Sequence, residues 1–561
     1  MLLEDLGLVG NCRFAALVDR RGAVVWCCLP RFDSEPVFAR LHDDRDGGEL
    51  LVGPAGGEVG AQRYVGDTNV LETTFRTAEG AWRVIDFAPR FFLYGRRFRP
   101  TQLVRILEPL EGAPRVQVRC EPRLGWSKAS PRAVHGSGHV TFEGFASALD
   151  LATDIPLTNL DGRGFLLTGR RHLVLSWGTV VDEDLAPLCQ RFMAETVAYW
   201  LTWVKRCKIP PLYQREVIRS ALALKLHCFD DTGAVVASPT TSIPASPGVR
   251  PRDLRHCRLK DAPSAIRALH SLGHFEERED YIRFLLDVAG SSPTLDLGPW
   301  VQVDGSSCPD ERVLDGWPGF GGDSSVLVGS PSKRQPSEVL GSLVLAVAPA
   351  FFDVRFEAKQ SRAVLDLMER LARRAIGVEA SGDAPIELRT LDNLMSWAAA
   401  DRMASVAARH RRALAPELEA EAGRIRDRIL SRAWSPALGS FTSTFGGEEL
   451  DSSLLRMAAL RFLPPDHPRL TGTIARIRQE LACAGVRDVL RLVEALAATG
   501  DVAGARAAMD RACSALSPLG LASEAVLPST SRMRGNFPHS ASHAALINAA
   551  FAASPTWAEV A

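Results

Sequence analysis

Residues 184–211 read DLAPLCQRFMAETVAYWLTWVKRCKIPP, and the patterning of the chain differs on the two sides of this stretch. Within it, large apolar side chains recur at the spacing of a helix face, at Phe192, Val197, Trp200 and Trp203. The pair Pro210-Pro211 ends the segment, because proline lacks the backbone N–H that a continuing helix needs. We therefore predict a linker helix, and a linker over 185–210, between two domains.

Before this linker, the chain consists of short apolar runs separated by turn residues, which is typical of β structure. Phe14–Val18 and Ala23–Leu29 are short apolar runs, and the turn signal Asp19-Arg20-Arg21-Gly22 between them indicates a hairpin. Similar runs predict strands at Leu103–Leu107, Val116–Cys120, Val140–Phe142 and His172–Trp177. Many short strands separated by turns are typical of an antiparallel β-sandwich, which we expect over residues 1–184.

The chain after the linker is dominated by helical patterns. Six concentric helical hairpins require twelve helices, so we expect an (α/α)₆ toroid over 211–561 and an α+β multidomain fold. Two long loops, 230–261 and 290–335, are rich in Pro, Gly, Ser and Asp. Long loops on a rigid scaffold often carry binding groups. The twelve predicted helices lie near 213–229, 262–272, 275–289, 336–353, 361–376, 388–410, 415–434, 450–463, 467–484, 486–499, 501–517 and 540–553.

Composition excludes several classes of function. Lys plus Arg and Asp plus Glu each number 66, so zero net charge gives no support to a nucleic-acid or membrane partner. The most apolar stretch, Leu343–Phe352, is too short to span a bilayer. The 11 cysteines contain no CxxC pair, which argues against a zinc site or a disulfide framework. Because the acidic start Met1–Asp5 is unlike a secretory signal, we expect a reduced, cytoplasmic setting.

Several blocks of sequence stand in order along nearly the whole chain. They are Glu4–Cys12 (EDLGLVGNC), Cys28–Ser34 (CLPRFDS), Gly66–Thr73 (GDTNVLET), Ser238–Pro244 (SPTTSIP) and Gly535–Pro538 (GNFP). Together these blocks resemble glycoside hydrolase family 15 proteins, which include glucoamylases, glucodextranases and some trehalases. The resemblance implies the same two-domain arrangement that the patterning predicts.

The resemblance also implies a pair of catalytic carboxylates. Inverting glycoside hydrolysis uses one protonated carboxyl group and one ionised carboxylate, about 6.5–9.5 Å apart, with a water between them. Glu387 in Pro385–Arg389 is similar to the family's general acid, and Glu524 in Gly520–Glu524 is similar to its general base. Glu387 also fits a simple first-turn acid that stabilises a helix N-terminus, and that interpretation stays open.

The loop Arg250–Ala262 resembles the family's sugar-binding segment. There Asp261 is similar to an acceptor of sugar hydroxyls, and Lys260 stands where the family has arginine. The resemblance further implies substrate-binding roles for Asp253, Arg255, Arg258 and Arg389.

This loop departs from the family pattern at two positions. Arg252 and Arg258 replace tryptophans, so the loop loses apolar faces that stack on sugar rings. Two interpretations of these arginines stay open. Either they form a basic loop that is simply solvated, or they form a pocket for an anionic ligand, such as a phosphorylated or acidic sugar. The loop after Glu387 is also shorter than in the family.

Two functions remain in competition. The first is an inverting, exo-acting hydrolase of α-glucosides, of the glucoamylase or trehalase type, which acts on a small-molecule or oligosaccharide substrate without cofactor or metal. The second is a non-hydrolytic descendant that uses the cleft for different chemistry or for binding a ligand or partner. His539 and His543, four residues apart, fit a helix cap or packing better than a metal site. The asp-rich motif of isoprenoid cyclases is absent, and the sequence does not indicate an oligomeric state.

Overall fold

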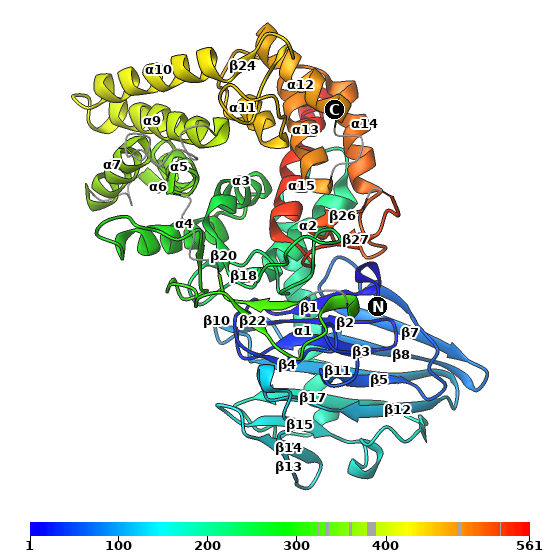
Figure 1. Cartoon of the computed structure of the whole chain (residues 1–561). Coiled ribbons are helices and arrows are strands. Elements are labelled where there is room, and N and C mark those ends of the chain that lie inside the picture. Colours follow the sequence, from blue (N-terminus) through cyan, green and yellow to red (C-terminus); the bar gives the residue numbers. More distant parts are fainter. Residues whose placement is uncertain are drawn as a thin grey trace.

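The first part of the chain forms two antiparallel sheets, and the remainder forms a ring of helices (Figure 1). The computed structural model describes residues 1–322, 325–330, 336–357, 362–377, 389–480, 485–527 and 529–560. One sheet has the order β1 (Gly7–Gly10), β2 (Ala15–Val18), β3 (Ala23–Cys28), β5 (Leu50–Pro54), β12 (Arg115–Cys120) and β16 (Phe165–Leu166), with β4 (Pro36–Phe38) paired to β3. The other has the order β13 (Arg132–His135), β14 (His139–Glu143), β15 (Leu149–Thr153), β17 (Arg171–Trp177), β11 (Gln102–Gly112), β8 (Gly80–Phe87), β7 (Leu71–Thr77) and β6 (Ala61–Tyr64).

Alternating residues of β11 show how the sandwich is layered. Leu103 and Leu107 belong to the apolar core between the two sheets. Val104 and Ile106 face the other way and pack against α1 (Leu185–Lys205), which contributes Leu188, Cys189 and Phe192. The helix therefore covers the outer face of the larger sheet and also makes contact with β9 (Phe91–Leu93), which forms a hairpin with β10 (Arg96–Phe98).

Six helices form an inner ring and six more surround it. Helix contacts close the inner ring in the order α3, α5, α9, η8 with α11, α13, α15 and back to α3. These inner helices are α3 (Ala262–Leu272), α5 (Pro336–Val347), α9 (Thr390–His410), the 3₁₀ turn η8 (Ser452–Leu455) with α11 (Arg456–Ala459), α13 (Val486–Ala498) and α15 (Ser540–Ala553). The outer helices are α2 (Gln214–Leu226), α4 (Phe275–Gly290), α7 (Arg362–Gly377), α10 (Ala415–Arg432), α12 (Pro468–Glu480) and α14 (Val502–Cys513).

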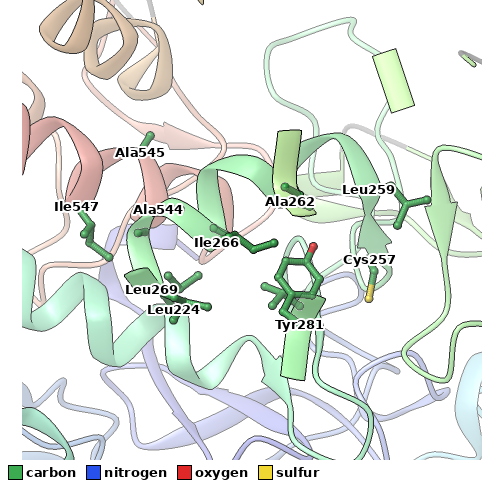
Figure 2. Close-up of a cluster of buried hydrophobic side chains, with 14 of the residues drawn as sticks. Leu224, Cys257, Leu259, Ala262, Ile266, Leu269, Tyr281, Ala544, Ala545 and Ile547 are labelled. Atoms are coloured by element: carbon green, nitrogen blue, oxygen red, sulfur yellow. The ribbon is translucent and has the colours of Figure 1, made fainter. Parts of the chain in front are cut away.

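The inner helices are buried on nearly every side, and their small side chains let neighbouring helices pack closely. In α15, a run of buried residues extends from Ser540 to Ala550. A side chain added at Gly341 of α5 would lie 2.6 Å from the backbone oxygen of Met395 in α9, so these two helices pack very closely. Figure 2 shows part of the apolar core, where Ile266 and Leu269 of α3 lie between Tyr281 of α4 and Ala544 of α15.

The predicted fold is confirmed, and all twelve predicted helices are found among the described residues. The helix predicted at 336–353 ends earlier because Pro349 follows α5, and the chain continues as η6 (Ala348–Phe351) and α6 (Val354–Glu357). The helix predicted at 450–463 is shorter as well, because Arg461 adopts a left-handed φ of 57°. The predicted domain limits lie on either side of α1, and we keep them as a proposal.

The long loops of the ring contain short ladders and 3₁₀ turns. The first ladder pairs β18 (Cys228–Phe229), just before residue 230, with β19 (Ala234–Val235). The described part of 230–261 and 290–335 also holds β20 (Cys257–Arg258) with β21 (Trp300–Val301), β22 (Arg312–Leu314) with β23 (Val326–Val328), and the turns η4 (Leu259–Asp261) and η5 (Phe320–Gly322). Other loops hold β24 (Trp434–Ser435) with β25 (Ser440–Phe441), and β26 (Ala525–Val526) with β27 (Met533–Arg534). A last short helix, α16 (Trp557–Val560), follows α15.

Candidate functional site

A cavity of about 750 Å³ lies inside the helical ring. Each of the six inner helical segments contributes residues to its wall, so the cavity follows the axis of the ring. Among the lining residues are Ile266 of α3, Leu345 of α5, Arg402 of α9, Ala459 of α11, Arg491 of α13 and Ala545 of α15. A concave volume of this size is typical of a site for a small molecule.

The starts of the inner helices meet at one end of this cavity. Asp261 precedes α3, Arg487 is in the first turn of α13, and their side chains are 3.7 Å apart. Glu338 in the first turn of α5 lies 3.7 Å from Arg456, the first residue of α11. This end therefore combines the partial positive charges of several helix N-termini with ionised side chains.

Asp261 is held ionised by its neighbours. Burial alone would raise the pKa of Asp261, but the charges of Arg258 and Arg487 outweigh it and hold that pKa well below its ordinary value. The Oδ2 atom of Asp261 is buried and has no hydrogen-bond partner among the described residues. A carboxylate oxygen in this position can accept a hydrogen bond from a ligand.

Lys260 lies beside Asp261 and lines the same cavity. Its Nζ donates to Glu338 Oε2 at 3.0 Å. Burial lowers the pKa of Lys260, the nearby Arg258 acts in the same direction, and Glu338 opposes both. The two sugar-binding candidates from the 3₁₀ turn before α3 thus lie together at the cavity end.

Glu524 lies on the loop between α14 and α15, immediately before β26. Its backbone N–H donates to Asn536 O at 3.1 Å, and the backbone N–H of Asn536 donates to Glu524 Oε2 at 3.2 Å. Gly535 has a φ of 73°, and a Cβ there would lie 2.6 Å from the Cβ of Glu524. A glycine is therefore needed at 535 to leave room for this glutamate. Glu524 is not among the residues that line the axial cavity.

The other predicted catalytic residue, Glu387, lies outside the described residues. The description resumes at Arg389, which is exposed and pairs with Thr444 in an isolated β-bridge just before α9. Arg389 is not among the described residues that line the cavity. The predicted substrate contact of Arg389 stays a prediction.

Asp253 and Arg255 occupy structural positions rather than the cavity. Their side chains form a bidentate ion pair with distances of 2.9 and 2.7 Å. Arg255 also donates to Ser34 O at 2.7 Å in the sandwich, and Asp253 accepts from the backbone N–H of Gly329 at 3.1 Å. Both groups are buried, join loops to one another and are not among the described residues that line the axial cavity. Their predicted substrate contacts stay predictions.

Arg258 lies near both the ring of Trp300 and the carboxylate of Asp261. Its guanidinium lies 5.2 Å from the ring centre of Trp300, and it is 3.7 Å from Asp261. Cation–π stacking accounts for one face of the guanidinium. Arg250, another basic residue of this loop, is directed elsewhere, since it pairs with Glu311 at 2.7 Å.

Sequence reasoning missed several charged residues at this end of the cavity. Arg456, Arg487 and Arg491 come from α11 and α13, and Glu338 and Asp392 from the first turns of α5 and α9. Burial and the charge of Glu338 raise the pKa of Asp392 to about 6, although Arg389 and Lys260 oppose the shift. The sequence offered no local signal for these residues, because acids are common in the first turn of a helix and the arginines meet their carboxylate partners only when the ring closes.

Within the described residues, no group of three or more His, Cys, Asp or Glu side chains is arranged to hold a metal ion. Among the same residues, no helix combines the length and apolar character that crossing a membrane requires.

Comparisons with known proteins show that the chain is similar to trehalases. Residues 1–153 match the family model described as trehalase-like, N-terminal. The trehalase of Mycolicibacterium smegmatis is 28% identical, over 98% of this chain and 90% of its own length. The trehalase of Mycobacterium tuberculosis is 29% identical, over 98% of this chain and 89% of its own.

A solved structure shows the same fold. A bacterial glucoamylase in complex with acarbose superposes with a TM-score of 0.68 and 12% identity, covering 98% of this chain and 94% of the other. At that identity the likeness concerns the fold alone. The match over residues 1–153 and the full-length relatives confirm the predicted resemblance: along its whole length the chain is similar to the trehalases of glycoside hydrolase family 15.

Proposed function

We propose that this chain is an inverting, exo-acting glycoside hydrolase of α-glucosides, with trehalose as the first substrate to test. The observation that carries the proposal is the axial cavity, which has Asp261 and Lys260 at the end where the inner helices begin. The loop that carries Glu524 leads into α15, whose Ala541 lines the same end. Full-length relatives named trehalases support the choice of substrate.

Asp261 and Lys260 have complementary roles in this proposal. The ionised Asp261 accepts hydrogen bonds from sugar hydroxyls through its buried, unpartnered Oδ2. Lys260 donates, while its pairing with Glu338 fixes the direction of its ammonium group. Binding of neutral hydroxyls thereby satisfies a buried acceptor that is otherwise costly to leave unpaired.

Glu524 and Glu387 supply the chemistry. Glu524 would act as the general base that takes a proton from water, with its carboxylate oriented by the hydrogen bond that its Oε2 accepts from the N–H of Asn536. Glu387 would protonate the glycosidic oxygen. Cleavage of the C–O bond then gives a hydroxyl on the leaving sugar and an inverted anomeric hydroxyl derived from water.

The test is glucose release from trehalose, maltose, maltotriose, isomaltose and starch. We expect wild type to release glucose from at least one of them, and Glu524→Gln and Glu387→Gln to lower the rate about 10²-fold or more. Glu419→Gln, at an exposed position of the outer helix α10, is the matched control and should retain the wild-type rate.

Two results would overturn the proposal. A folded wild-type protein that releases no glucose from any of the five substrates would exclude the hydrolase. Unchanged turnover in Glu524→Gln, with circular dichroism matching wild type, would exclude Glu524 as the base.

The competing function is a non-hydrolytic protein that binds a ligand in the same cavity. It is favoured by one observation: cationic side chains outnumber anionic ones in the described cavity wall. That function predicts ligand binding without release of glucose.

A further inference from the structure

The end of the axial cavity contains an unusual concentration of arginine. Arg456, Arg487 and Arg491, which we call the arginine cluster, line the cavity together with Lys260. Arg258 lies next to them, 3.7 Å from the same Asp261 that Arg487 approaches. Three chain segments that are distant in sequence thus bring five cations to one place.

The carboxylates nearby only partly compensate the arginine cluster. Arg487 and Arg456 each approach a carboxylate at 3.7 Å, from Asp261 and Glu338 respectively, which is longer than a hydrogen bond. Arg491 is better satisfied and donates to Asp488 and Ser452, both at 3.0 Å. Glu338 already accepts from Lys260, so its charge is shared between two cations.

The electrostatic consequence is an excess of positive charge in a sheltered place. Burial and the neighbouring Arg487 lower the pKa of Arg491 to about 10, with Asp488 opposing. Burial also lowers the pKa of Arg456 from its ordinary value, against the attraction of Glu338 and Asp261. The helix N-termini at this end add positive potential. An anion placed among these groups would relieve their mutual repulsion.

We propose that the arginine cluster binds an anionic group, a phosphate, sulfate or carboxylate, that is carried by the sugar in the cavity. The inference rests on the proposed function and adds α-glucosides that carry an anionic group to the sugars that the same cavity accepts. Planar guanidinium groups suit this task because they bind the oxygens of such groups through paired hydrogen bonds.

The neighbourhood of Asp261 indicates a sugar rather than a free anion. Asp261 is ionised and repels an anion, yet its buried Oδ2 lacks a partner and can accept a hydroxyl. Arg491 lies one helical turn beyond Arg487, about 6 Å along α13 at 1.5 Å per residue. The structure therefore combines an acceptor for hydroxyls with a neighbouring cationic site for an anion, as a charged sugar requires.

Calorimetric titration at low salt tests this inference without depending on turnover. The probes are glucose, glucose 6-phosphate, glucuronate and inorganic phosphate. We expect at least one charged sugar to bind wild type 10-fold or more tightly than both glucose and inorganic phosphate. Arg491→Gln and Arg456→Gln should each weaken that binding 10-fold or more, whereas Arg491→Lys should weaken it less, because it keeps the charge.

Controls separate the inference from folding and from hydrolysis. Arg424→Gln, on the exposed side of α10, should bind all four probes as wild type does. If Arg491→Gln does not fold, Arg456→Gln and Arg491→Lys carry the test.

Equal affinity of wild type for charged and neutral sugars would overturn the inference, and so would equal affinity for the charged sugars and inorganic phosphate. Loss of glucose release from the neutral substrates would instead contradict the hydrolase proposal, and these binding constants would still be measurable.

Discussion

At the scale of single residues, Asp392 carries the clearest energetic consequence. It is 8% exposed in the first turn of α9, and its pKa is raised to about 6 by burial and by Glu338. In the unfolded chain the same carboxyl group has a pKa of 3.8. Because the folded pKa is the higher one, ionising Asp392 at neutral pH costs the folded protein stability.

Replacement of Asp392 by Asn should therefore stabilise the protein in a pH-dependent manner. Well below pH 4 the group is protonated in both states and the substitution removes no penalty. As pH rises from about 4 to about 6, wild type loses up to about 3 kcal/mol relative to the variant, at about 1.4 kcal/mol per pKa unit, and above about pH 6 the difference stays constant. Midpoints of thermal unfolding at pH 4 and pH 7.5 should show a much larger difference at the higher pH, and an equal difference at both would contradict this account.

Some residues at the candidate site could be expected from the sequence, and others are found only in the folded structure. Asp261 and Lys260 were expected from the resemblance of their loop to the family's sugar-binding segment, and they do line the end of the cavity. Arg255 was expected to bind substrate on the same resemblance, but its side chain forms an ion pair with Asp253 and donates a hydrogen bond to Ser34 O of the sandwich. Arg456 and Arg487 gave no local signal, because only closure of the ring brings them to Glu338 and Asp261.

At the scale of elements, the helices were well predicted because their apolar spacing is strong. The segments 262–272 and 540–553 match α3 and α15 at both ends. The loops were less predictable, since their ladders contain only two or three residues per strand and depend on distant partners. Lengths of short helices such as α11 were overestimated because one left-handed residue, Arg461, ends the pattern early.

A buried charge cluster joins α2 and α4 to the sandwich. Lys225 of α2 lies 3.0 Å from Asp230 and 3.3 Å from Glu277 of α4. Arg90, which follows β8, lies 2.6 Å from Asp230. Removal of one member leaves charges that are buried without full compensation.

Lys225→Met should accordingly destabilise the protein by about 3–5 kcal/mol. Arg13→Met is the control, because Arg13 and Asp231 form an ion pair at 3.2 Å with side chains that are 38% and 36% exposed. A pair of that kind contributes about 1 kcal/mol or less. Unfolding in guanidinium chloride should give a clearly larger loss of unfolding free energy for Lys225→Met than for Arg13→Met. Similar losses would show that the buried cluster stabilises the protein no more than the exposed pair does.

At the scale of the whole molecule, the sandwich and the ring share one apolar core. A continuous cluster of buried residues includes Leu8, Leu17 and Trp26 of the smaller sheet together with Val217 of α2 and Ile266 of α3. The indole N–H of Trp26 donates to Pro239 O at 2.7 Å, in the loop that precedes the sugar-binding segment. The sandwich thus supports the loops from which the candidate site is built.

This shared core predicts that the two parts unfold together. Calorimetry of wild type should show one cooperative transition, because separation of the parts would expose the outer face of the smaller sheet. Trp26→Ala should lower stability by about 3–5 kcal/mol, the usual cost for a fully buried tryptophan. Trp557→Ala, at a side chain that is 55% exposed, should have a much smaller effect. Two well-separated transitions in wild type would mean that the interface contributes little, and that the site loops depend on the helical ring alone.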